Sequence, residues 1–151
     1  MKELKNMMLN GLYSVLYEKL ANMHFDYNLE AFTEMFNGVC SEKKYAYLIY
    51  VMAKSETTDL HLLICDFLSY TDTFFVDRYT VQKWHLKRAL EISPNNVKVM
   101  SWIIDEFYDH PDSPFKNNEI YQYALLVHEA YPDDKRAMEV INGWDPDKKN
   151  H

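Results

Sequence analysis

Apolar residues recur at helical spacing along most of this chain, and this periodicity constrains the fold more than any other feature. Near the N-terminus the apolar positions follow the i, i+3, i+4, i+7 pattern of an amphipathic helix: Leu4, Met7, Met8, Gly11, Leu12, Val15, Leu16 and Leu20. The same rhythm returns in nearly every later segment. Only residues 45–52 and 73–76 have a composition typical of strands, and neither is followed by a hairpin turn. The periodicity therefore predicts an all-α protein.

Local stop signals divide this pattern into seven or eight helices. Asn37-Gly38 has the composition of a helix C-terminus, and Pro111 and Pro114 cannot both lie within a helix. The expected helices span about residues 4–20, 26–37, 41–53, 58–68, 75–92, 97–108, 118–131 and 134–142. Short connections between them favour antiparallel helical hairpins.

The size and composition of the chain fit one domain. With 151 residues, 48% of them hydrophobic, the chain can bury a substantial core. We expect a single all-α domain over residues 1–143 and a frayed tail over residues 144–151, unless Trp144 docks back onto the body. The three glycines are isolated from one another, which excludes a glycine-rich phosphate-binding loop.

The sequence also indicates the compartment. Residues 1–20 mix five charged residues with their apolar ones and lack the continuous apolar core of a secretory signal. The apolar run at residues 45–53 is too short to span a membrane. Cys40 and Cys65 lie far apart, without a metal-binding or redox spacing. These features predict a cytoplasmic protein with two reduced cysteines.

Two helix endings resemble each other 38 residues apart. Residues 84–96 and 122–134 both end a helix with a proline followed by two polar residues. Together with Ala89 at a small-residue position, Pro94 resembles the end of a tetratricopeptide repeat, and the resemblance covers about residues 81–138. The chain departs from that pattern at Gln82, at Val127-His128 and in its repeat length, which is about 34 in the family. An irregular α bundle with one convergent helix ending remains the alternative.

The resemblance implies where a partner would bind. In tetratricopeptide arrays the first helix of each pair lines a concave groove. By register that helix is 97–109, and the residues that would face the groove or its rim are Trp102, Asp105, Tyr108 and Asp109.

The charge pattern indicates the kind of partner. Residues 101–134 hold eight acidic residues and one lysine, a net charge of −7 that equals the charge of the whole chain. Such a field attracts cationic surfaces and repels nucleic acid and anionic membranes. Aromatic residues lie in the same window, as expected of a protein-binding surface. The same composition would result if the acidic residues lay on the solvent-exposed sides of two helices and the aromatic residues lay in the core.

Catalytic and metal-binding patterns are weak. The six histidines form no zinc spacing, and no serine or cysteine has the surroundings of a nucleophile. His110, between Asp109 and Asp112, is the best candidate for a metal ligand or a catalytic group. A solvated loop is the simpler interpretation of this group, and we expect no enzyme activity, cofactor or metal.

We therefore interpret the chain as a protein that binds another protein. The most concrete hypothesis is an acidic inhibitor, such as an immunity protein, that neutralises a basic nuclease-type toxin. Asp105, Asp109 and Asp112 would pair with basic residues of the partner. Trp102, Tyr108 and Tyr121 would be the aromatic anchors. The alternatives are a tetratricopeptide-like scaffold or chaperone that binds peptides, and an enzyme or metal protein that uses the His110 region.

Overall fold

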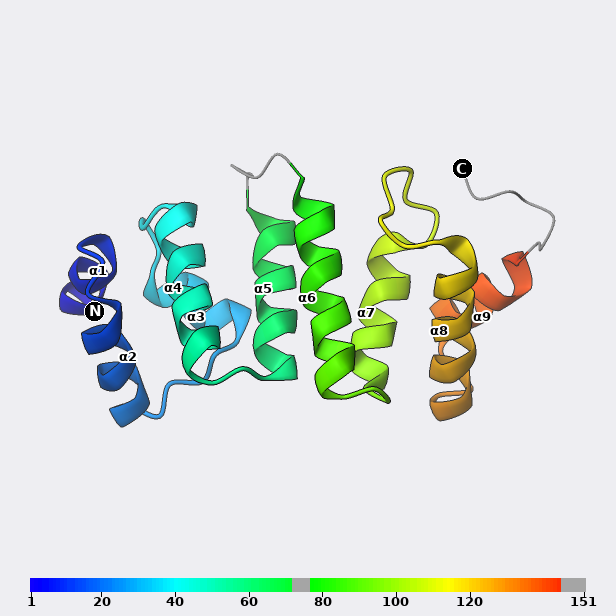
Figure 1. Cartoon of the computed structure of the whole chain (residues 1–151), viewed down its shortest axis with the longest axis horizontal. Helices are drawn as coiled ribbons and strands as arrows, with labels where there is room; N and C mark the ends of the chain where they lie inside the picture. Colours follow the sequence, from blue (N-terminus) through cyan, green and yellow to red (C-terminus); the bar gives the residue numbers. More distant parts are fainter. Residues whose placement is uncertain (72–76, 145–151) are drawn as a thin grey trace. The chain divides into compact units, whose positions relative to one another are not determined.

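All regular secondary structure in the described part of the chain is α-helical. The computed structural model describes residues 1–71 and 77–144. Within them nine helices follow one another (Figure 1): α1 (Lys2–Leu9), α2 (Tyr13–Asn22), α3 (Leu29–Met35), α4 (Ser41–Lys54), α5 (Thr58–Tyr70), α6 (Arg78–Ile92), α7 (Val97–Phe107), α8 (Asn117–Ala130) and α9 (Lys135–Gly143). This confirms the predicted all-α class. None of these helices is long and apolar enough to cross a membrane.

The first predicted helix is wrong in one respect, because it is two helices. α1 ends at Leu9 and α2 begins at Tyr13, with Gly11 between them at φ +71°. The backbone N–H groups of Gly11 and Leu12 donate to the carbonyls of Met8 and Met7, which closes the end of α1. A positive φ is natural for glycine, so Asn10-Gly11 ends a helix just as Asn37-Gly38 does, with Gly38 at φ +82°.

Side-chain caps explain where several other helices start. Asn28, Thr57, Asn96 and Asp134 each accept a hydrogen bond from the backbone N–H three residues later. The second expected helix, predicted to begin at about residue 26, begins at Leu29, and Asp26 accepts a hydrogen bond from the side-chain amide of the capping Asn28. The residues Phe75 and Val76, expected within the fifth helix, lie outside the described residues.

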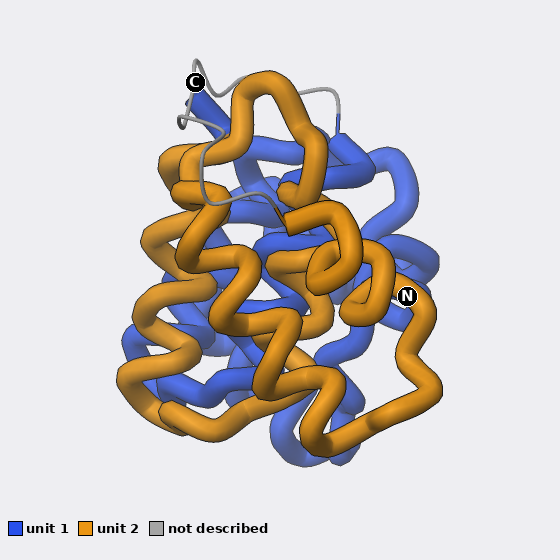
Figure 2. The backbone as a smooth tube through the Cα atoms, turned by 90° about the vertical axis from the view of Figure 1, so that its right-hand side faces the viewer, with its two compact units in different colours: residues 1–78 blue, residues 79–151 orange. Residues whose placement is uncertain are grey.

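The chain divides into two compact units, drawn in different colours in Figure 2. Unit 1 comprises residues 1–78 and unit 2 comprises residues 79–151. In unit 1, α4 packs against α1, α2 and α5, and α3 packs against α5. Its core is rich in aromatic rings: Phe32, Phe36, Tyr47 and Phe67 are almost completely buried. The expectation of one domain over residues 1–143 stays a prediction.

In unit 2, helices α7, α8 and α9 pack against one another pairwise. α7 and α8 run in opposite directions and are joined by the loop of residues 108–116 (Figure 1). The predicted loop at residues 110–114 is therefore confirmed. One side of each of these three helices faces the interior. The buried residues are Val99, Met100, Ile103, Ile104, Phe107, Ile120, Ala124, Val127, Ala137 and Val140.

Candidate functional site

The solvent side of α7 carries the first of the residues that the sequence singled out. Met100, Ile103 and Phe107 are buried, so residues on the opposite side of the helix face outward. Asp105 is exposed there, and Trp102 is half-buried with its ring centroid 6.0 Å from that of Phe107. The apolar side of α7 thus fixes the helix and directs Asp105 toward solvent.

Tyr108, the residue after α7, is held by α9. Its carbonyl oxygen accepts a hydrogen bond from Nη2 of Arg136 at 3.2 Å, and the guanidinium carbon lies 4.8 Å from its ring centroid. Gly143 lies so close to the Tyr108 hydroxyl that a Cβ at that position would collide with it. Tyr108 therefore packs along α9 with a cation over its ring.

Carboxylates from both helices surround this contact. The pKa of Asp105 is raised by desolvation and by the nearby carboxylate of Asp134, and Arg136 only partly opposes these effects. The pKa of Tyr108 is raised by desolvation, by Asp109 and by Glu139, and is lowered by Arg136. We call the surface formed by six residues the α7–α9 face: Asp105, Tyr108, Asp109, Asp134, Arg136 and Glu139.

The α7–α9 face has four carboxylates and one guanidinium, so it is negative despite the internal arginine. Arg136 is itself shared between Tyr108 and Glu139, because its Nη1 lies 2.7 Å from Oε2 of Glu139. A single guanidinium cannot neutralise four carboxylates, and the pKa of Asp105 is raised by desolvation first and then by the negative charge of Asp134.

The charge of the acidic window is only partly balanced within the protein. Glu119 pairs with Lys87 of α6, and Asp134 caps α9. Six further carboxylates of the window form no ion pair with any described residue: Asp105, Glu106, Asp109, Asp112, Glu129 and Asp133. Their charge is therefore available to a partner.

Basic residues of α6 are used inside unit 2. Lys83 donates a hydrogen bond to the carbonyl of Pro114, and Lys87 donates to the Tyr123 hydroxyl at 3.1 Å. Both ammonium groups lie 5.5 Å from the ring centroid of Phe115. Desolvation and the charge of Lys83 lower the pKa of Lys87. These lysines hold the loop that precedes α8 and leave the α7–α9 face unneutralised.

The loop after α7 places Asp109, His110 and Asp112 together, but His110 is already engaged. Its Nε2 lies 3.0 Å from the Tyr79 hydroxyl, and its Nδ1 accepts a hydrogen bond from the backbone N–H of Asp112 at 3.1 Å. Asp109 adopts φ +60° and is exposed, as is Asp112. Among the described residues, no three potential metal ligands come together.

Tyr121 lies at the other end of the candidate site. Its ring stacks on that of Trp144, with centroids 4.6 Å apart and planes 16° from parallel. This contact confirms that Trp144 docks onto the body, while residues 145–151 of the expected tail lie outside the described part. Because Trp144 follows Gly143, which packs on Tyr108, the stacked pair borders the α7–α9 face.

Sequence reasoning missed the contribution of α9. Asp134, Arg136 and Glu139 belong to the face. The acidic window ended at Asp134, so it excluded Arg136, which contacts Tyr108. The tetratricopeptide register could have indicated α9, because in that register α7 is the first helix of one pair and α9 is the first helix of the next pair. The pairwise packing of α7, α8 and α9 is consistent with either a helical array or a bundle.

Comparison with known proteins identifies no relative: no protein-family model matches the chain, and no curated protein or solved structure shows significant similarity to it.

Proposed function

We propose that this protein binds a cationic partner protein through the α7–α9 face and performs no chemistry itself. The observation that carries the proposal is that Asp105 and Asp109, two carboxylates of this face, form no ion pair with any described residue. Aromatic residues at the same surface, Trp102 and Tyr108, supply rigid contact area beside the charges.

The electrostatics of Asp105 support the same proposal. Besides desolvation, the carboxylate of Asp134 raises the pKa of Asp105, so the two groups repel in the free protein. A lysine or arginine from a partner would relieve this repulsion, which makes binding more favourable than the attraction alone. The internal Arg136 illustrates the geometry, since its guanidinium lies over Tyr108 among these carboxylates.

The most specific form of the proposal is an inhibitor, such as an immunity protein, that neutralises a basic nuclease-type toxin in the cytoplasm. Carboxylates on a small helical protein can replace the phosphates that such a partner normally contacts, and steering by the negative field speeds capture. Cys40 and Cys65 are free thiols, which is compatible with a reducing compartment.

The second candidate is a scaffold or chaperone that binds peptides along α7 and α9. The observation that favours it is the direct packing of α7 against α9, because first helices in contact are what line the groove of a repeat array. This candidate predicts weak, broad binding of short segments, whereas the inhibitor binds one folded partner tightly.

Affinity capture from a native lysate separates the candidates. The immobilised protein is compared with Asp105→Lys/Asp109→Lys and with Glu18→Lys/Glu34→Lys, a control with the same charge change at exposed positions of unit 1. The proposal predicts one basic protein, retained at low salt and lost by the first variant alone. Inhibition of that protein's activity supports the inhibitor, and a mixture of peptides supports the scaffold. Equal capture by all three proteins would contradict the assignment of the face.

A further inference from the structure

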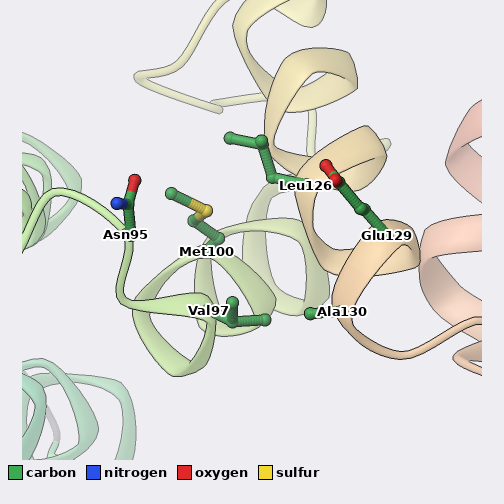
Figure 3. A pocket seen from close by; sticks show the side chains of 6 residues that line it. All are labelled: Asn95, Val97, Met100, Leu126, Glu129 and Ala130. Carbon is green, nitrogen blue, oxygen red and sulfur yellow. The ribbon is translucent and has the colours of Figure 1, made fainter.

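Unit 2 has a concave surface that shares no residue with the α7–α9 face. It is a pocket of about 370 Å³, between the α6–α7 turn and the C-terminal half of α8 (Figure 3). Six residues line it: Asn95, Val97, Met100, Leu126, Glu129 and Ala130. The volume is near the lower limit of small-ligand sites, which is enough for one or two amino-acid side chains.

The interior of the pocket is apolar. Val97 and Met100 come from the start of α7, and Leu126 and Ala130 come from α8. Leu126 is 44% exposed although these apolar side chains converge around it. Met100 has a flexible thioether side chain that adapts to differently shaped apolar groups. An aliphatic side chain placed here would bury the exposed part of Leu126.

The two ends of the pocket are polar and differ from each other. In the view of Figure 3, Asn95 lies on one side and Glu129 on the other. Glu129 is exposed and has no ion pair with a described residue, and the Asn95 amide makes no hydrogen bond to one. A carboxylate at the rim favours a cation, and an amide can both donate to and accept from a peptide backbone.

We propose that this pocket binds a peptide segment of a partner in which an aliphatic side chain and a lysine or arginine are adjacent. The aliphatic group occupies the space between Met100 and Leu126, and the cation pairs with Glu129. Charge complementarity selects this occupant, because Glu129 is the one charged side chain among the six described residues that line the pocket and forms no ion pair with a described residue. The proposal goes beyond the binding of a cationic protein by the α7–α9 face and does not depend on it.

A methyl NMR titration tests this proposal, since Val97, Met100, Leu126 and Ala130 all carry methyl groups. The probe is the capped tetrapeptide acetyl-Gly-Leu-Lys-Gly-amide, compared with versions in which lysine becomes glutamate or leucine becomes glycine. We expect shifts at these four residues with millimolar affinity. Replacing the leucine should weaken binding more than about tenfold, because its burial supplies most of the free energy. Replacing the lysine should weaken binding about three- to fivefold.

Variants distinguish the pocket from its surroundings. Ala130→Phe fills the pocket and should abolish the shifts, and Glu129→Gln should remove the preference for lysine over glutamate. The controls are Leu125→Ala, because Leu125 is 38% exposed on α8 but does not line the pocket, and Glu106→Gln. Both should bind normally, and so should Asp105→Asn, which tests independence from the α7–α9 face.

Three results would overturn the proposal. The first is equal binding of the leucine and glycine peptides, and the second is the absence of shifts at about 10 mM peptide, where a millimolar site is mostly filled. The third is shifts of the free protein that depend on its own concentration, which would assign the pocket to a second copy of this chain.

Discussion

Aromatic side chains have different surroundings in the two units. In unit 1, Phe32 lies at the centre of a ring cluster, with centroids 5.1 Å from Phe36, 6.4 Å from Tyr47 and 6.3 Å from Phe67. In unit 2, several rings instead contact cations from neighbouring helices, as Tyr108 contacts Arg136 and Phe115 contacts Lys87. The same residue types thus form the interior of unit 1, whereas in unit 2 they both line the interior, as Phe107 does, and position charged groups.

This difference teaches where mutations should act. Removing a buried ring in unit 1 should lower the free energy of unfolding strongly, because core packing is lost. Removing a cation in unit 2 should lower it less and should change the pKa values of nearby groups. The following predictions test this contrast in order of decreasing effect.

The largest effect is expected for Phe32→Ala. Phe32 is fully buried, and its removal leaves a cavity among three other rings. We expect a loss of about 3–5 kcal/mol in the free energy of unfolding. Urea denaturation measures this change, with Tyr70→Ala as the control because Tyr70 is 80% exposed. A loss under about 1 kcal/mol would show that the cluster is not the core of unit 1.

A smaller effect is expected for Lys87→Ala. Lys87 pairs with Glu119, donates to the Tyr123 hydroxyl and lies over the Phe115 ring. Because it is partly exposed, we expect a loss of only about 1 kcal/mol. The matched variant is Lys19→Ala on α2, a lysine of similar exposure, which removes an exposed pair with Glu3. That variant should cost less than Lys87→Ala, and an equal cost would contradict the role of Lys87.

Arg136→Ala tests the contact between α7 and α9 directly. We expect a loss of about 0.5–1 kcal/mol from the stacking on Tyr108. The pKa values of Asp105 and Tyr108 should both rise further, because Arg136 lowers each of them. Carboxyl and tyrosine ring resonances followed by NMR during pH titration measure these shifts. Lys135→Ala, at the adjacent exposed position, should leave both pKa values unchanged.

The smallest effect is expected for Asp105→Asn, and its sign depends on pH. The folded-state pKa of Asp105 lies above its ordinary value of 3.8, so ionisation of this carboxyl opposes folding. Its favourable contribution is present below pH 3.8 and is lost as the pH rises through the raised pKa. The variant should therefore be more stable than the wild type at neutral pH, by less than about 0.5 kcal/mol. A variant that is less stable than the wild type at neutral pH would show that the ionised Asp105 does not destabilise the folded protein.

The fold was predictable because its signals are local. Helical periodicity, the caps at Asn96 and Asp134 and the loop around Pro111 and Pro114 all depend on residues close in sequence. The missed break at Gly11 also had a local signal, which the uninterrupted apolar pattern obscured. Local reasoning thus located the helices and misjudged one boundary.

The site was predictable only in part, for a physical reason. Asp105, Tyr108 and Asp109 share one helix end, so spacing alone could group them. The contact of Arg136 with Tyr108 spans 28 residues, and it depends on how α7 and α9 pack. The stacking of Tyr121 on Trp144 has the same origin. No spacing rule specifies side-chain contacts between separate helices.

The central claim is that the α7–α9 face binds a cationic partner. Its most direct test is the affinity of the captured basic protein for the wild type, for Asp105→Lys/Asp109→Lys and for Glu18→Lys/Glu34→Lys, measured over a range of salt concentrations. We predict that the first variant weakens binding at least about tenfold and flattens the salt dependence, while the unit 1 control stays close to the wild type. Equal affinity and equal salt dependence for all three proteins would show that the carboxylates of α7 and α9 are a solvated surface.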